Sequence, residues 1–185
     1  MSRQFWKEAI FWAVADGTAI ANTVTETIIF PNQTIFANYM ADGRVLALEA
    51  YGRYSTTGTP TLRFRLRWNG VAGTVLTDSG TITSGSGVTS AMWKVQILIV
   101  TRANGASGSL FVTGEATLYS ATAPTVGSAT GAPAIAPMGS AGITVPAAVT
   151  VDLTVDTPLS LTATWGTASA SNTLTGHNYV GSSEN

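Results

Sequence analysis

Alternation of apolar and polar side chains is the dominant pattern along the chain. It is clearest over 61–68, where four apolar side chains alternate with three arginines: Leu62, Phe64, Leu66 and Trp68 against Arg63, Arg65 and Arg67. Successive side chains of a strand point to opposite faces, so this pattern predicts a half-buried strand. Residues 44–54 alternate in the same way. Seven further strands are predicted over 24–30, 74–83, 92–102, 109–119, 148–155, 159–165 and 173–180.

Turn-forming residues separate these segments. They occur at Asp42-Gly43, 55–60, Asn69-Gly70, 84–87, Asn104-Gly105 and 156–158. Short strands, glycine and proline punctuation and the absence of a helical period predict an all-β protein, an antiparallel β-sandwich of about nine strands with a jelly roll as the expected topology. If 55–60 closes a hairpin between 44–54 and 61–68, Glu49 pairs with Arg65 or Arg67 across the two strands.

Two segments depart from the strand pattern. Residues 1–23 form an N-terminal aromatic segment ahead of a β-sandwich domain over 24–185. Within that domain, the Ala/Thr/Pro/Gly-rich stretch 120–147 is long for a connection and carries no charged side chain. We favour an extended arm laid on another subunit, and a plain flexible loop is the alternative.

Composition narrows the possible functions. Only 10% of the 185 residues are charged, and nine basic residues face ten acidic ones, giving a formal net charge of −1. Nucleic-acid binding, which relies on clustered basic side chains, is therefore not expected. No apolar run is long enough for a membrane helix. The chain has no cysteine, which excludes disulfides and thiolate metal sites.

Candidate catalytic residues are few. The single histidine, His177, lacks the neighbours that a catalytic triad would need, and the chain cannot supply the ligands of a zinc site. Glu49 and Glu115 are the mid-strand carboxylates that could form a glycosidase pair, but a salt bridge is the simpler explanation for Glu49. We expect no enzymatic activity, no cofactor, no metal and no small-molecule substrate.

Two groups of side chains are candidate contacts with a partner. Arg63, Arg65 and Arg67 project from one face, with Arg53 expected on the neighbouring strand. Three interpretations stay open for this arginine row: an ordinary solvent-facing sheet, docking on an acidic protein surface, or nucleic-acid contact. The first twelve residues carry four large aromatics, which either pack under their own sheet or anchor the chain in a partner: Phe5, Trp6, Phe11 and Trp12.

Residues 44–118 resemble a family of tailed-phage virion proteins. The resemblance rests on the run 51–67 (YGRYSTTGTPTLRFRLR), followed by 69–74 (NGVAGT) and 78–80 (DSG). It continues with Trp93 ahead of a long strand and with 105–108 (GASG) before the next one. Proteins of this family are jelly-roll domains that form trimers and serve as capsid decoration (cement) proteins, head fibres or tail components.

The resemblance implies a structural protein made in the host cytoplasm and placed on the surface of the phage head. Its expected partners are two further copies of itself, in a homotrimer, and the major capsid protein. The aromatic N-terminus, the arginine row and the neutral arm would make these contacts, the arm through Pro133, Ile135, Pro137 and Met138. The alternative is a receptor-binding or carbohydrate-binding jelly-roll module of a phage fibre or tail.

Overall fold

The alternating segments form antiparallel strands in the computed structural model, which describes residues 7–119, 133–140 and 146–184. In β6, Leu62, Phe64 and Leu66 are fully buried, and the arginines between them point to the opposite face. The fourteen strands of this part of the chain are β1 (Glu8–Trp12), β2 (Ile20–Ala21), β3 (Thr27–Ile28), β4 (Gln33–Ile35), β5 (Val45–Ser55), β6 (Thr61–Trp68), β7 (Thr74–Asp78), β8 (Ile82–Thr83), β9 (Ala91–Ala103), β10 (Gly108–Leu118), β11 (Ala134–Met138), β12 (Ala148–Val151), β13 (Thr157–Trp165) and β14 (Thr173–Ser183).

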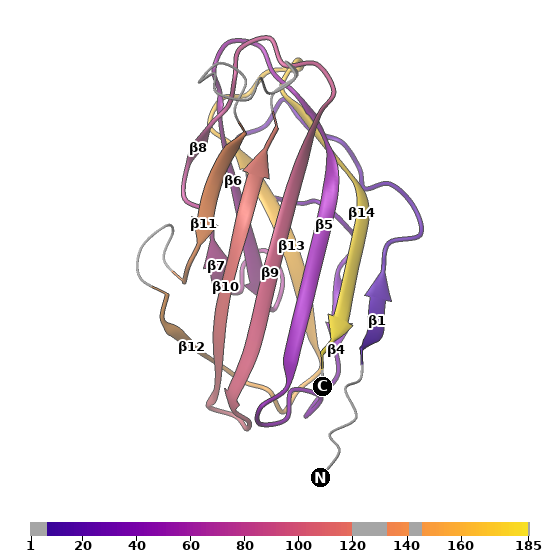
Figure 1. Ribbon diagram of the computed structural model, residues 1–185, viewed down its shortest axis with the longest axis vertical. Helices are drawn as coiled ribbons and strands as arrows, with labels where there is room; N and C mark the ends of the chain where they lie inside the picture. The colour runs from indigo at the N-terminus through magenta and orange to yellow at the C-terminus, as the bar shows by residue number, and fades with distance from the viewer. Residues whose placement is uncertain (1–6, 120–132, 141–145, 185) are drawn as a thin grey trace.

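The strands make two antiparallel sheets that pack as a jelly-roll-like sandwich (Figure 1). Sheet A has the order β1-β14-β5-β9-β10-β11, with β12 paired to β10 and β2 paired to β14. Sheet B has the order β3-β13-β6-β7, with β4 paired to β13 and β8 paired to β6. The predicted all-β sandwich is confirmed, and each of the nine predicted segments contains a strand. No helix that could cross a membrane occurs in the described ranges.

Aromatic side chains fill the space between the sheets. Trp68, Trp93 and Trp165 are all buried, as the alternation predicts. The Trp93 ring lies 5.3 Å from that of Phe64 and donates a hydrogen bond from Nε1 to the Thr175 carbonyl. The ring contact ties sheet A to sheet B through the centre of the molecule, and the hydrogen bond joins β9 to β14 within sheet A.

Turn chemistry predicts some connections correctly and one wrongly. Asn69 and Gly70, both with positive φ, close the β6–β7 hairpin as expected. Residues 55–60, however, do not close a hairpin, because β5 belongs to sheet A and β6 to sheet B. The connection crosses from one sheet to the other and is held by Thr56, which donates to the Gly85 carbonyl and accepts from the Val88 amide. Alternation shows which face of a strand is buried, but it does not identify the neighbouring strand.

The described part of the N-terminal segment belongs to the sandwich rather than preceding it. β1 pairs with β14 at the edge of sheet A, and β2 pairs with the opposite end of β14. In the neutral stretch 120–147, the described residues 133–140 include β11, which pairs along β10. The remainder of that stretch, except 146–147, lies outside the described residues.

Candidate functional site

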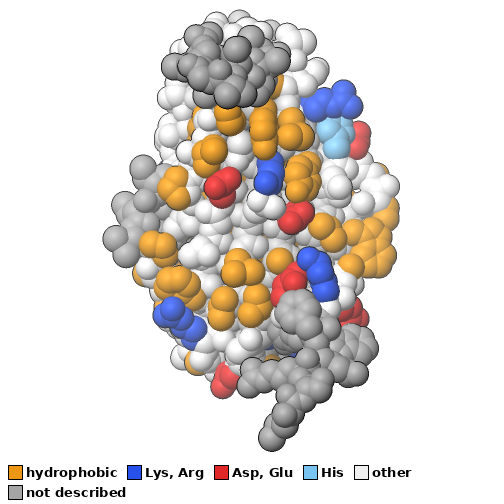
Figure 2. All heavy atoms as spheres, in the orientation of Figure 1, with side chains coloured by type: hydrophobic (Ala, Val, Ile, Leu, Met, Phe, Trp, Pro, Cys, Tyr) orange, Lys and Arg blue, Asp and Glu red, His pale blue; other side chains and the backbone are white. Residues whose placement is uncertain are grey.

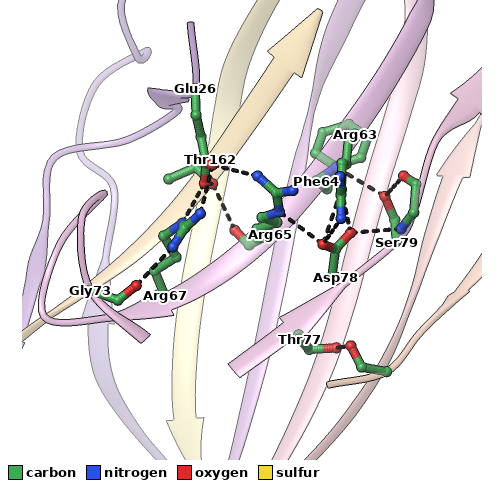
Figure 3. A network of polar contacts seen from close by, with 12 residues as sticks. Glu26, Arg63, Phe64, Arg65, Arg67, Gly73, Thr77, Asp78, Ser79 and Thr162 are labelled. Atoms are coloured by element: carbon green, nitrogen blue, oxygen red, sulfur yellow. Dashed lines mark hydrogen bonds and ion pairs between the residues drawn. The ribbon is translucent and has the colours of Figure 1, made fainter. Parts of the chain in front are cut away.

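The three arginines of β6 are engaged within the chain (Figure 3). Glu26, from the segment before β3, accepts two hydrogen bonds from Arg67, at 2.6 and 2.8 Å, and one from Arg65 at 2.5 Å. Asp78, at the end of β7, accepts from Arg63 and from Arg65 Nε, the latter at 2.8 Å. The two carboxylates therefore join three segments on the outer face of sheet B into one network: the segment before β3, β6 and β7.

Hydrogen bonds within this network stabilise the ionised form of both carboxylates. Burial alone would raise the pKa of Glu26, but hydrogen bonds from Arg67, Thr162 and Arg65 outweigh burial and lower this pKa to about 2. Burial likewise opposes ionisation of Asp78, yet hydrogen bonds from Arg63, Arg65 and the Gly80 amide lower its pKa. Both carboxylates are therefore ionised at neutral pH.

The network corrects our hypothesis that the arginine row faces an acidic partner or nucleic acid. The side chains of Arg65 and Arg67 are only 18% and 14% exposed, and their charges are already paired inside the chain. Arg53 is exposed on β5 of sheet A, so it is not on a strand next to the row. Glu49 is on β5 as well and pairs with neither Arg65 nor Arg67, because β5 and β6 belong to different sheets.

An exposed aromatic pair marks the side of the sandwich where β1 and β4 lie next to each other (Figure 1). Trp12 at the end of β1 is 59% exposed, and Phe36 just after β4 is 66% exposed. Both line an apolar pocket of about 330 Å³ whose wall also includes Ile10 and Ile35. We call this surface the aromatic edge.

The other predicted contact residues have different positions. Phe11 and Met138 are buried, at 7% and 2% exposure, which contradicts an interface role for them: each points into the core from an edge strand. Ile135, on β11, is 58% exposed, and Pro137 beside it is exposed while Pro133 is half-buried. Phe5 and Trp6 lie outside the described residues.

A polar row crosses the outer face of sheet A. Glu49 of β5, Gln96 of β9 and Glu115 of β10 are direct neighbours in the strand register. Gln96 Nε2 donates to Glu49 Oε1 at 3.2 Å, and the Tyr51 hydroxyl donates to Glu49 Oε2 at 3.0 Å. Figure 2 shows this face, where hydrophobic side chains are spread among few charged ones. Glu49 and Glu115 are the two mid-strand carboxylates named above as a possible glycosidase pair, and Gln96 lies between them.

Two shallow hollows lie along this row. The first, of about 430 Å³, is lined by Glu49, Gln96 and Glu115 on one side and by Ala47, Leu98 and Thr113 on the other. The second, also of about 430 Å³, is lined by Lys7, Ala9, Ala47, Glu49, Val180 and Ser182. Ala47 and Glu49 line both hollows, so the two are adjacent, and together we call them the transverse groove.

His177 is not part of either surface. It occupies an irregular position in β14, and its Nδ1 lies 2.8 Å from a carboxylate oxygen of Asp16, whose side chain is 63% exposed. Within the described ranges, no group of three His, Asp or Glu side chains is arranged to hold a metal ion.

One signal in the sequence could have predicted half of the polar row. The Asn104-Gly105 turn closes the β9–β10 hairpin, and counting outward from it places Gln96 close to Glu115. The pairing of β5 with β9 brings Glu49 beside them, and no local turn predicts that long-range contact.

Comparison with known proteins gives little further guidance. No protein-family model and no curated protein matches the chain. Among solved structures, it is similar to the CBM2 module of the evolved Dit of Lactobacillus casei BL23 phage J-1. The match covers 97% of each chain, with a TM-score of 0.35 and 11% sequence identity. At this level the similarity says nothing about what the chain binds, so its function has to be inferred from its own residues.

Proposed function

We propose that the chain is a non-catalytic structural protein of a tailed-phage particle, which decorates the head as a homotrimer and contacts its neighbours through the aromatic edge. The resemblance of residues 44–118 to phage virion proteins supports the class of protein. The exposure of Trp12 and Phe36 around one apolar pocket is the observation that carries the proposal.

Exposed aromatic pairs of this kind suit an interface. Large rings bury much apolar area at a small entropic cost, so they are enriched among the residues that dominate binding energy. A ring more than half exposed stabilises the fold little, but it contributes fully when a partner covers it. In a symmetric trimer the contact occurs three times, and several trimer–shell contacts per particle add avidity.

The proposal is tested by mass and by sedimentation of the full chain. Light scattering is expected to give three times the 19.1 kDa chain mass, and the protein is expected to co-sediment with phage capsids. Trp12→Ala and Phe36→Ala should both weaken these associations. Met92→Ala is the matched control, because Met92 is 44% exposed and lies on β9 opposite Arg53, outside the aromatic-edge pocket. A monomer that does not sediment with capsids would contradict the proposal.

The second candidate function is carbohydrate binding by a receptor-binding module of a fibre or tail. It is favoured by the transverse groove and by the polar row that forms one of its rims. This surface is largely separate from the proposed assembly surface: among the residues that the structure describes, Ala9 alone lines both the groove and the aromatic-edge pocket.

A further inference from the structure

We infer that the transverse groove binds a neutral, linear oligosaccharide laid across the strands of sheet A. The inference deepens the second candidate function and does not depend on trimer assembly. It rests on the length of the groove, on the hydrogen-bonding groups along its polar rim and on the small residues along its opposite side.

The groove is long and is set by strand register. One rim follows the neighbouring positions Val180, Glu49, Gln96 and Glu115, and the other follows Ala9, Ser182, Ala47, Leu98 and Thr113. It thus crosses β1, β14, β5, β9 and β10, and four spacings between adjacent strands give a length of about 19 Å. A channel of this shape fits an extended ligand better than a compact one.

Small residues keep the groove open. Ala47 lies at the junction of the two hollows, with Ser182 on one side, and Thr113 lies beyond Leu98 on the other. Larger side chains at these positions would fill the groove beside the polar rim. The ion pair of Lys7 and Glu184, at 2.8 Å, lies at the β1 end.

The polar rim presents oriented donors and acceptors. Hydrogen bonds from Tyr51 and Gln96 fix the Glu49 carboxylate, so its orientation is set before a ligand arrives. The Thr117 hydroxyl donates to Glu115 Oε1 at 3.2 Å. The described residues donate no hydrogen bond to Glu115 Oε2 or to the side-chain oxygen Oε1 of Gln96. Carboxylate and amide groups bind pairs of hydroxyls, because each offers more than one site in a single plane.

Other ligand classes match these groups poorly. Two carboxylates repel a polyanion such as nucleic acid. They lie two strands apart, about 10 Å between their backbones, which is too far for one cation to bridge. A peptide binds a sheet by pairing with an edge strand, whereas this groove crosses the face. A neutral chain rich in hydroxyls uses the donors and acceptors of the rim and also the apolar surface of Leu98.

The experiment is calorimetric titration of the full chain with three probes: cellohexaose, maltohexaose and hexa-N-acetylchitohexaose. We expect saturable binding of at least one probe, at least tenfold tighter than binding of the disaccharide of the same linkage. Ala47→Trp fills the groove and Gln96→Ala removes the centre of the rim, so each should weaken binding at least tenfold. Ala148→Trp is the matched control, since Ala148 is exposed on β12 of the same sheet, outside the groove.

A variant is compared only if its thermal unfolding midpoint stays within a few degrees of that of the parent protein. If Ala47→Trp does not fold, Gln96→Ala alone supplies the test. Absence of binding to all three probes at millimolar concentration overturns the inference. So does binding that both groove variants retain. A lower oligomer mass of Ala47→Trp together with unchanged saccharide affinity also overturns it, because the groove would then be an interface between copies. Trp12→Ala should lower the mass and leave saccharide binding intact, which separates this inference from the assembly proposal.

Discussion

Phe11 and Trp12 are adjacent in β1 but have opposite surroundings. The Phe11 ring lies 5.2 Å from the ring of Tyr179 and covers Gly181, where a Cβ atom would come within 2.2 Å of it. Trp12 points outward and is 59% exposed. One aromatic therefore holds the edge strand to the core, while its neighbour projects into solvent.

This contrast predicts opposite effects of two alanine substitutions. Phe11→Ala should lower the free energy of unfolding by about 3 kcal/mol, since it removes a buried ring and leaves a cavity. Trp12→Ala should change it by no more than about 0.5 kcal/mol, as is usual for an exposed site. Thermal unfolding at a concentration where both variants are monomeric measures the difference. Equal destabilisation by the two would show that Trp12 is also part of the core.

The lowered pKa of Glu26 predicts that the protein loses stability in acid. The Glu26 pKa of about 2 in the folded chain is below the ordinary value of 4.5, so the folded state favours the carboxylate. The stabilisation is complete above about pH 4.5 and is lost as the pH falls towards 2. We expect Glu26→Gln to lower the free energy of unfolding by about 2 kcal/mol at pH 7, an amount that allows for solvent screening.

Denaturant unfolding from pH 7 to pH 2 measures this effect. The difference between the parent and Glu26→Gln should shrink below pH 4.5, because the unfolded parent chain then takes up a proton at Glu26, whereas the folded chain takes it up only near pH 2. The control is Glu8→Gln, whose side chain is exposed. A difference that stays constant down to pH 2 would argue against charge as the source of the stabilisation.

The loop that crosses between the sheets depends on one hydroxyl. Thr56 is 6% exposed, and its Oγ1 bonds to the Gly85 carbonyl at 2.7 Å and to the Val88 amide at 3.2 Å. Thr56→Val keeps the shape but leaves both backbone groups unpaired, which should cost about 1–3 kcal/mol. The same change at exposed Thr59 should have little effect. Chemical denaturation compares the two, and equal midpoints would refute the role of the hydroxyl.

Gly52 is required by the packing of Trp93. A Cβ atom at position 52 would lie 2.0 Å from the Thr175 carbonyl oxygen and 2.6 Å from the indole nitrogen of Trp93. Gly52→Ala should therefore lower the thermal midpoint by several degrees and change the near-ultraviolet signal of Trp93. Gly58→Asn is the control, because position 58 has open space and asparagine tolerates its φ of 65°. A Gly52→Ala protein with parental stability would mean that the two strands can separate locally.

Local features of the fold could be predicted from the sequence because they depend on neighbouring residues. Strict alternation over 61–68 predicts the buried face of β6 correctly, and Asn69-Gly70 predicts its hairpin. The three buried tryptophans follow from the same period. The five short or edge strands β1, β2, β4, β8 and β11 were not predicted as separate strands, because two to five residues carry too little periodicity.

The ion-pair network and the place of Glu49 in the polar row could not be predicted, because they depend on contacts between distant segments. Glu26 lies 41 residues before Arg67 and belongs to a segment with no pattern that indicates a partner. Without Glu26, the arginine row resembles an open basic face. In the same way, Glu49 joins Gln96 only through the pairing of β5 with β9, a contact across 47 residues.

The ion-pair network makes the outer face of sheet B different in character from the outer face of sheet A. Glu26 and Asp78 neutralise the arginines within the same chain, so the outer face of sheet B has few unpaired charges to attract a charged partner. The groove lies on the outer face of the opposite sheet. The trimer proposed above would carry three copies of the transverse groove, related by its rotation axis.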